Sequence, residues 1–219
     1  MSAPPRVHDL TALLTTHMPV WPSSPLPVFE PMGVVSRDGY SIERVNCLTH
    51  TGTHMDAPYH FLEDGLTVDR IAPDRLVGRA AVLDLRGELS GPLVGPEPVR
   101  RHWPKSFRPE VVLLETGWSH RRAPTREYLY DFPGLTPEAA TWVADQGIHG
   151  IGTDTLGIDP YSNSKFEAHK VFLGRGIWIL EALDHLDELA EERPYTLVAG
   201  PLKIAGASGA MARVLALEA

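Results

Sequence analysis

The sequence predicts one α/β domain with mixed β-sheets, and three observations lead to this fold class. Short apolar runs of strand length recur along the chain and outnumber the segments with helical signals. The 20 prolines and 19 glycines are spread over the whole sequence, which favours short strands and turns over a helix bundle. No GxGxxG follows a strand and no P-loop occurs, so a doubly wound nucleotide-binding sheet is not expected.

In chain order, the first predicted element is a hairpin over residues 34–49 that turns at Asp38-Gly39. Short apolar runs that end in Gly, Asp, Thr or Pro then predict buried strands at 79–87, 110–118, 148–154, 176–183 and 195–204. Residues 86–109 are expected to form a surface connection between the first two of these strands.

Two helices are predicted. The first covers residues 136–147, because Thr136 suits an N-cap, Pro137 suits the first helical position and Gly147 suits a C-terminal stop. The second, over residues 184–192, is expected to be acidic and mostly exposed. The length of 219 residues suits a single domain, residues 1–219, with an N-terminal arm of about residues 1–30.

Composition and charge limit the partners. The net charge is -8 with histidines neutral, whereas proteins that bind nucleic acid are usually basic, so no nucleic-acid partner is expected. No apolar run approaches the ~20 residues of a membrane helix, and no apolar signal segment opens the sequence. The single cysteine, Cys47, allows no internal disulfide and fits a reducing compartment. We therefore expect a cytoplasmic protein without a membrane partner.

The most informative stretch is HTGTHMDAPYHF, residues 50–61, which places three histidines and an aspartate close together. Gly52, the β-branched threonines beside it and Pro58 disfavour a helix, so a strand end with a tight turn is predicted. Such a turn would let His50, His54 and Asp56 converge. Two imidazoles and a carboxylate form a three-ligand metal site that leaves positions open for water, as hydrolytic sites require. A polar turn with hydrogen-bonded histidines is the simpler alternative.

His60, after Pro58, has two possible roles. Beside a metal-bound water it would act as general acid and base, because the unperturbed pKa of histidine is near ~6.5. As a fourth ligand it would instead close the site. Proton transfer is the preferred role, because three protein ligands already suffice.

Other candidate ligands lie far along the chain. Glu181 ends the apolar run 177–180, where a carboxylate is costly unless it is paired or bound to metal. A strand-end glutamate that points to water is equally compatible with this stretch. A second metal, bridged to the first by Asp56, would give both His169 and Glu181 a function. The loop with Asp154 and Asp159 is better explained as a solvated acidic turn than as a metal site.

A serine nucleophile is not predicted. The sequence GASGA at residues 206–210 is not the G-x-S-x-G motif, and no strand–elbow–helix pattern surrounds Ser208.

Residues 50–61 resemble the H-x-G-T-H-x-D-x-P-x-H signature of the cyclase-type metal-dependent hydrolases. That family includes bacterial kynurenine formamidase, isatin hydrolase and proteins described as polyketide cyclases. The resemblance covers nearly the whole chain: MPVWPSSP is similar to the family's M-x-V-W-P-G stretch, and similarity continues over 133–160, 168–183 and 199–217. Two stretches near the expected substrate depart from the family, PSSP after Trp21 and residues 154–169, so the chemistry carries over better than the substrate.

The resemblance implies a swivelling β/β/α fold with mixed sheets and a site for one or two metals. By this resemblance His50, His54 and Asp56 would hold the first metal, and Asp56, His169 and Glu181 the second. His60 would be the proton donor and acceptor, and Trp21 would contact the substrate, with simple packing of Trp21 as the alternative. Zn²⁺ suits these ligands, and Mn²⁺ is the alternative. A homodimer or higher homo-oligomer is also implied.

The expected function is metal-dependent hydrolysis of an amide-type C–N bond in a small, aromatic substrate. Arylformamidase activity on N-formylkynurenine, a reaction of tryptophan catabolism, is the leading candidate. A cyclic amide (isatin-like) or lactone hydrolase, or a polyketide-type cyclase, is the alternative within the family. A non-catalytic protein that binds metal or a small molecule is the alternative of a different class, against which the complete set of expected ligands argues.

Overall fold

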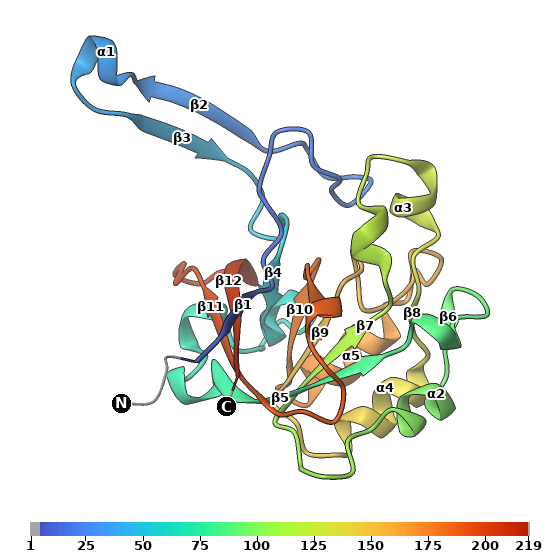
Figure 1. Ribbon diagram of the computed structural model, residues 1–219. Coiled ribbons are helices and arrows are strands. Elements are labelled where there is room, and N and C mark those ends of the chain that lie inside the picture. The colour runs from blue at the N-terminus through green and yellow to red at the C-terminus, as the bar shows by residue number, and fades with distance from the viewer. Residues whose placement is uncertain (1–4, 219) are drawn as a thin grey trace.

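A closed β-barrel forms the centre of the computed structural model, which describes residues 5–218 (Figure 1). Its strands pair in the order β12-β11-β5-β7-β9-β10-β4, and β4 pairs again with β12 to close the ring. Strands β5, β7, β9 and β10 run parallel to one another, and the other strand pairs of the ring are antiparallel. The sheet is therefore mixed, as predicted. The strands are β4 (His54–Asp56), β5 (Val77–Asp84), β7 (Val111–Glu115), β9 (Gly150–Thr153), β10 (Trp178–Glu181), β11 (Tyr195–Pro201) and β12 (Gly209–Glu218).

Strands β5, β7, β9, β10 and β11 confirm the five predicted buried strands. Their apolar runs are continuous because both faces of the sheet are covered. In β7, Val111 and Leu113 point into the barrel core, whereas Val112 and Leu114 pack against the helices outside. β1 (Val7–Asp9) pairs with β12 and extends the sheet beyond the ring.

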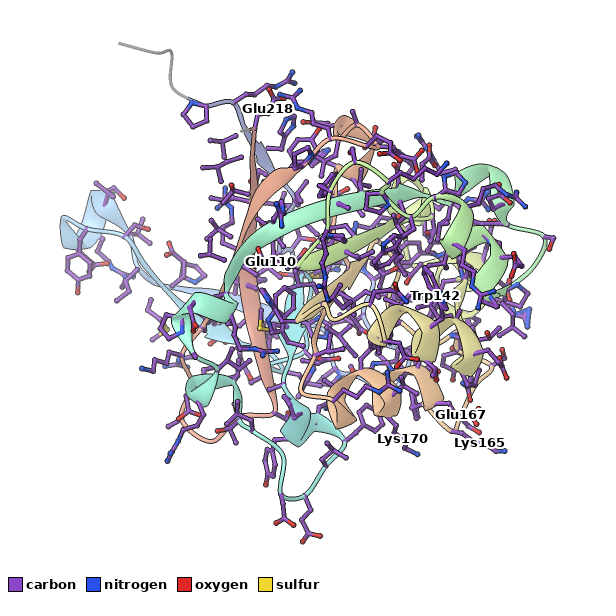
Figure 2. The ribbon with its side chains drawn as sticks, turned by 90° about the horizontal axis from the view of Figure 1, so that it is seen from below. Glu110, Trp142, Lys165, Glu167, Lys170 and Glu218 are labelled. Carbon is purple, nitrogen blue, oxygen red and sulfur yellow. The ribbon has the colours of Figure 1, made fainter. Side chains whose placement is uncertain are left out.

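Helices cover one side of the barrel. They are α2 (Pro96–Arg101), α4 (Pro137–Ala144) and α5 (Glu167–Gly174), and α3 (Arg126–Tyr130) lies apart from them (Figure 1). Helix α4 confirms the prediction, because the Thr136 hydroxyl accepts the Ala139 N–H at 3.2 Å. On α5, Lys170 points away from the barrel (Figure 2), which leaves His169 on the buried side. None of the described helices is long and apolar enough to cross a membrane.

The predicted helix at 184–192 is wrong. Only a single 3₁₀ turn, Leu186–Glu188, forms there, after His185 in the left-handed conformation (φ 55°). The segment is held by contacts with distant parts of the chain rather than by its own helical hydrogen bonds. Glu188 lies 2.9 Å from His8, and Glu191 accepts the Asp84 N–H at 2.6 Å.

The two remaining sheets lie outside the barrel, and each modifies a prediction. A hairpin is present, formed by β2 (Val28–Gly33) and β3 (Ile42–Asn46), but its first strand lies wholly before the predicted range of 34–49. A short helix, α1 (Val35–Asp38), makes the turn and ends at Gly39 (φ 78°). The expected surface connection at 86–109 contains helix α2 and strand β6 (Leu93–Val94), which pairs with β8 (Gly134–Leu135).

Candidate metal centre

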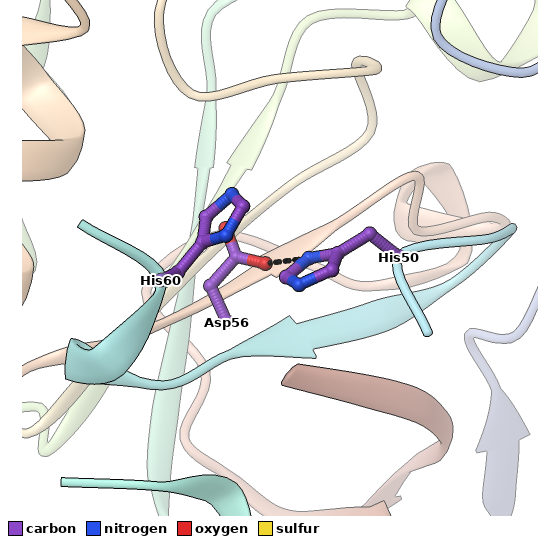
Figure 3. A group of neighbouring side chains, drawn as sticks. All are labelled: His50, Asp56 and His60. Carbon is purple, nitrogen blue, oxygen red and sulfur yellow. Dashed lines mark hydrogen bonds and ion pairs between the residues drawn. The ribbon is translucent and has the colours of Figure 1, made fainter. Parts of the chain in front are cut away.

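Strand β4 presents two of the candidate ligands to one side. Alternate side chains of a strand point to opposite faces, so Met55 fills the barrel core while His54 and Asp56 lie on the outer face. The predicted tight turn occurs at Gly52, whose φ of 64° is the left-handed conformation that favours glycine. This turn brings His50 back to Asp56, with its Nδ1 at 2.7 Å from Asp56 Oδ1 (Figure 3).

Glu181 reaches the same place through strand pairing. It lies directly opposite His54 in the antiparallel β10–β4 pair, where cross-strand side chains are neighbours. Glu181 Oε2 is 3.5 Å from His54 Nε2, and Glu181 Oε1 is 3.0 Å from His169 Nε2. The side chain is buried, so the alternative of a glutamate that points to water is wrong.

His169 is oriented by a buried carboxylate. Its Nδ1 lies 2.7 Å from Asp159 Oδ2, which leaves Nε2 directed at Asp56 Oδ2 (3.5 Å) and at Glu181. Asp159 also accepts the backbone N–H groups of Ala168 and His169. Both Asp154 and Asp159 are at most 1% exposed, so the prediction of a solvated acidic turn is wrong. Asp159 instead holds a candidate ligand in place, as carboxylates commonly do behind metal-bound histidines.

The other two imidazoles are oriented in the same way. His54 Nδ1 lies 2.8 Å from the Gly52 carbonyl oxygen, which leaves Nε2 free to face Asp56. His50 Nε2 lies 2.9 Å from Ser208 Oγ, and its Nδ1 faces Asp56. The contacts Ser208–His50–Asp56 follow the order of a serine-hydrolase triad. Ser208 is not among the residues that line the pocket described below, so it orients His50 rather than reaching a substrate.

One buried oxygen shows that a cation fits this centre. Asp56 is fully buried, and its Oδ2 has no hydrogen-bond partner, which is costly for a carboxylate. Candidate ligand atoms lie within 4.8 Å of one another in two groups that share Asp56. The groups are His50 with Asp56 and His60, and His54 with Asp56 and Glu181.

The electrostatics of the centre also favour positive charge. Burial disfavours a charged imidazole, yet Asp56 and Glu181 raise the pKa of His54 to about 9. Against the same effect of burial, Asp159, Asp56 and Glu181 hold the pKa of His169 well above its ordinary value. Burial raises the pKa of Asp56, but the nearby imidazoles of His169, His50 and His54 outweigh burial and lower this pKa. A divalent cation would take the place of positive charge on His54 and His169.

His60 differs from the buried histidines. It lies at the end of a 3₁₀ turn, Pro58–His60, and its side chain is open to the pocket. Its ring stacks on His50 with 4.1 Å between centroids, and the two approach Asp56 together (Figure 3). Desolvation by the surrounding protein atoms lowers the pKa of His60, although Asp56 opposes this effect.

A pocket of about 320 Å³ lies above the centre. It is lined by every predicted site residue except Asp56, which is buried beneath: Trp21, His50, His54, His60, His169 and Glu181. Aromatic rings form its wall, with Phe166 at 5.3 Å from Phe61 and 6.1 Å from Trp21 between centroids. Sequence reasoning missed Phe61, Phe166 and Leu156, because an apolar residue of a pocket wall has the same sequence signal as one of the core.

The sequence is similar to known proteins over nearly its whole length. Residues 8–160 match the family model described as "Putative cyclase". A kynurenine formamidase from Erythrobacter litoralis (strain HTCC2594) is 33% identical over 214 residues, which cover 97% of this chain and 94% of that protein.

Solved structures share the fold. Isatin hydrolase A from Labrenzia aggregata, bound to benzyl benzoate, superposes with a TM-score of 0.86 at 29% identity and covers 98% of this chain and 94% of that chain. A potential metal-dependent hydrolase with cyclase activity gives a TM-score of 0.80 at 30% identity, with 98% of each chain covered.

Fold, site and relatives together define this chain as a metal-dependent amide hydrolase. It belongs to the cyclase family, as the signature in residues 50–61 indicated.

Proposed function

We propose that this chain hydrolyses the amide C–N bond of a small aromatic substrate at the centre beneath Trp21. The observation that carries the proposal is the buried carboxylate of Asp56, around which the other four candidate ligands gather and whose Oδ2 has no hydrogen-bond partner. These ligands form the floor of a pocket whose walls are aromatic. The ligands are His50, His54, Asp56, His169 and Glu181.

Asp56 is proposed as the bridging ligand. Its Oδ1 faces His50 and His54, and its Oδ2 faces His169, so one carboxylate can serve two cation positions. We assign His50, His54 and Asp56 to one position and Asp56, His169 and Glu181 to the other. When bound, a divalent cation lowers the pKa of water toward ~7 and polarises a carbonyl oxygen. Zn²⁺ is the proposed ion and Mn²⁺ the alternative.

His60 is proposed to carry the proton. It is open to the pocket, whereas His54 and His169 are buried and oriented by acceptors behind them. His60 would take the proton of the attacking water at one ring nitrogen and deliver it to the leaving nitrogen of the amide. Its grouping with His50 and Asp56 also supports the competing role of a ligand, which its alanine variant separates in the Discussion.

The aromatic wall selects the substrate. Trp21, Phe61 and Phe166 can stack on a planar ring with little loss of side-chain entropy. The kynurenine formamidase relative makes N-formylkynurenine the leading candidate substrate. A cyclic amide such as isatin is the second candidate, and one observation favours it. Within residues 5–218, neither lysine nor arginine lines the pocket, so no such side chain there would neutralise the carboxylate of an amino-acid substrate.

The experiment compares turnover of N-formylkynurenine and isatin by the chelator-treated protein before and after Zn²⁺ or Mn²⁺ is restored. Metal-dependent turnover of at least one substrate is expected, and the ratio of the two kcat/KM values separates the candidates. If metal binds with full stoichiometry and neither compound nor a simple aryl ester is hydrolysed, the proposal is wrong and a binding role is favoured.

We further propose that the protein works in the cytoplasm, which its single free cysteine supports.

A further inference from the structure

The backbone changes conformation immediately after the candidate ligand Glu181. Strands β10 and β4 pair as far as Glu181 opposite His54, and their ladder ends there. The next residue, Ala182, has a φ of 53°, in the left-handed region that favours glycine because a Cβ is crowded there. A residue other than glycine keeps such a conformation only when the surrounding structure holds it. Ala182 is 2% exposed and lines the pocket, so this strained residue belongs to the site.

The hydroxyl of Thr53 holds Ala182. The register of the two strands would place Thr53 opposite Ala182, and here the Thr53 side chain supplies a hydrogen bond in place of the main chain. Thr53 Oγ1 donates to the Ala182 carbonyl oxygen at 2.7 Å and accepts the Ala12 N–H at 2.8 Å. Because an N–H group can only donate, the hydroxyl hydrogen is directed to Ala182. All three residues are 2% exposed, so water does not compete for these bonds.

The other contacts of Ala182 do not replace this bond. Its N–H donates to the Thr155 carbonyl oxygen at 2.8 Å, which fixes the opposite side of the residue. Arg122 Nη2 lies 3.4 Å from the Ala182 carbonyl oxygen, but its shorter bond, at 2.9 Å, goes to the Leu183 carbonyl oxygen. Without the Thr53 hydroxyl, the Ala182 carbonyl group would therefore keep only the long contact with Arg122.

We propose that Thr53 is a positioning residue, whose hydroxyl holds Ala182 in the left-handed conformation and thereby aims the Glu181 carboxylate at the cation. This inference rests on the proposed function, which assigns Glu181 to a cation position. The Ile158 N–H donates to Glu181 Oε1 at 2.8 Å and fixes the carboxylate end of the side chain, whereas Thr53 fixes its backbone end. Thr53 also directly precedes His54, so one residue sets the positions of two facing ligands.

Two substitutions at Thr53 separate its hydroxyl from its packing. Thr53→Val keeps the shape of the side chain but removes the hydroxyl, so Zn²⁺ binding should weaken by ~10-fold, as when a group that orients a metal ligand is lost. Thr53→Ser removes a buried methyl group but keeps the hydroxyl, so it should bind Zn²⁺ as the wild type does. Competition with a chromophoric chelator on the metal-stripped full chain measures these affinities. Wild-type affinity in Thr53→Val, or an equal loss in Thr53→Ser, overturns the proposal.

A glycine at position 182 tests the route through the backbone. Glycine adopts a φ of 53° without a steric cost, so it does not need the Thr53 hydroxyl to keep this conformation. Thr53→Val/Ala182→Gly should therefore bind Zn²⁺ more tightly than Thr53→Val alone. The double variant still lacks the hydrogen bond to Ala12, so this recovery cannot come from that bond. A double variant that binds no more tightly than Thr53→Val overturns the proposal.

Thr11→Val is the matched control. The Thr11 hydroxyl also donates to a carbonyl oxygen and accepts an N–H, both of Val214, at 3.3 Å and 2.9 Å. It therefore loses the same two kinds of bond, but these bonds do not involve a residue next to a candidate ligand. Its Zn²⁺ affinity should equal that of the wild type. A loss as large as that of Thr53→Val would show a general effect of removing such a hydroxyl and overturn the proposal.

The proposed function and this inference fail in different ways. A wild type that binds neither Zn²⁺ nor Mn²⁺ overturns both, because Glu181 then has no cation to face. A wild type that binds Zn²⁺ but hydrolyses none of the test compounds overturns the activity alone, and the affinities of the Thr53 variants still decide the positioning role. Wild-type turnover together with unchanged Zn²⁺ affinity in Thr53→Val overturns this inference and leaves the proposed function standing.

Discussion

Asp56 is the residue that the two proposed cation positions share. Because its two oxygens face different histidines, Asp56→Ala should weaken both cation positions at once. Elemental analysis after dialysis is expected to show less than one ion per chain. Full occupancy in this variant would remove the bridging role.

His60 can be tested separately from the ligands. Because it is open to the pocket, His60→Ala should keep the metal content of the wild type while kcat falls by ~10²-fold or more, the usual contribution of a general acid–base group. Metal analysis and steady-state kinetics on the same sample decide the role. Loss of metal together with activity would make His60 a ligand.

Asp159 should act through His169. Asp159→Asn keeps the size of the side chain but removes the charge behind the His169 ring, so metal affinity should fall by ~10–100-fold. Competition with a fluorescent chelator measures this affinity. The control is Asp154→Asn: Asp154 is equally buried but accepts hydrogen bonds from Thr116, Trp118 and Ser119, and its variant should bind metal as the wild type does. Equal losses in both variants would indicate a general effect on folding.

At the scale of elements, β9 and β10 can pack closely because Gly150 has no side chain. A Cβ at Gly150 would lie 2.2 Å from the Trp178 ring, so Gly150→Ala must displace a fully buried indole. Overpacking of this kind costs ~1–3 kcal/mol of unfolding free energy. Denaturant unfolding should show this loss. In the control, Gly174→Ala at the end of α5, a Cβ meets nothing within 4 Å, so stability should be unchanged or higher.

For the molecule as a whole, a bound cation should stabilise the fold. The proposed ligands come from β4, α5, β10 and the turn before β4, so the cation would link segments that are distant in sequence. A ligand at 100 times its Kd stabilises a protein by ~2.7 kcal/mol. Chelation should therefore lower Tm by several degrees, and Zn²⁺ should restore it in differential scanning fluorimetry. The Tm of Asp56→Ala should respond weakly to either treatment; an equal response would place the stabilising metal at another site.

Much of this protein was determined by local sequence. The buried strands were predictable because each is a short apolar run with a stop signal, and α4 was predictable from Thr136 and Pro137. The turn at Gly52 was predictable because the glycine and the residues that disfavour a helix lie within the signature itself. The same stretch pointed to His50, His54 and Asp56, since these residues are neighbours in the chain.

The family resemblance also named His169, Glu181 and Trp21 from the sequence, but tertiary structure alone decided which contacts such distant residues make. Glu181 meets His54 because β10 pairs with β4, and Asp159 meets His169 because a loop folds against α5; no local signal encodes either contact. The segment 184–192 has helical composition, yet its carboxylates pair with His8 and with the backbone of Asp84 instead. Phe166 is part of the pocket wall because α5, which begins next to it, packs against the Pro58–His60 turn. Local signals predict an element when its own residues supply the partners for its backbone hydrogen bonds and the apolar side chains of its buried face. They cannot predict a site whose charges and rings are paired across the fold, because those pairs form only when the barrel closes.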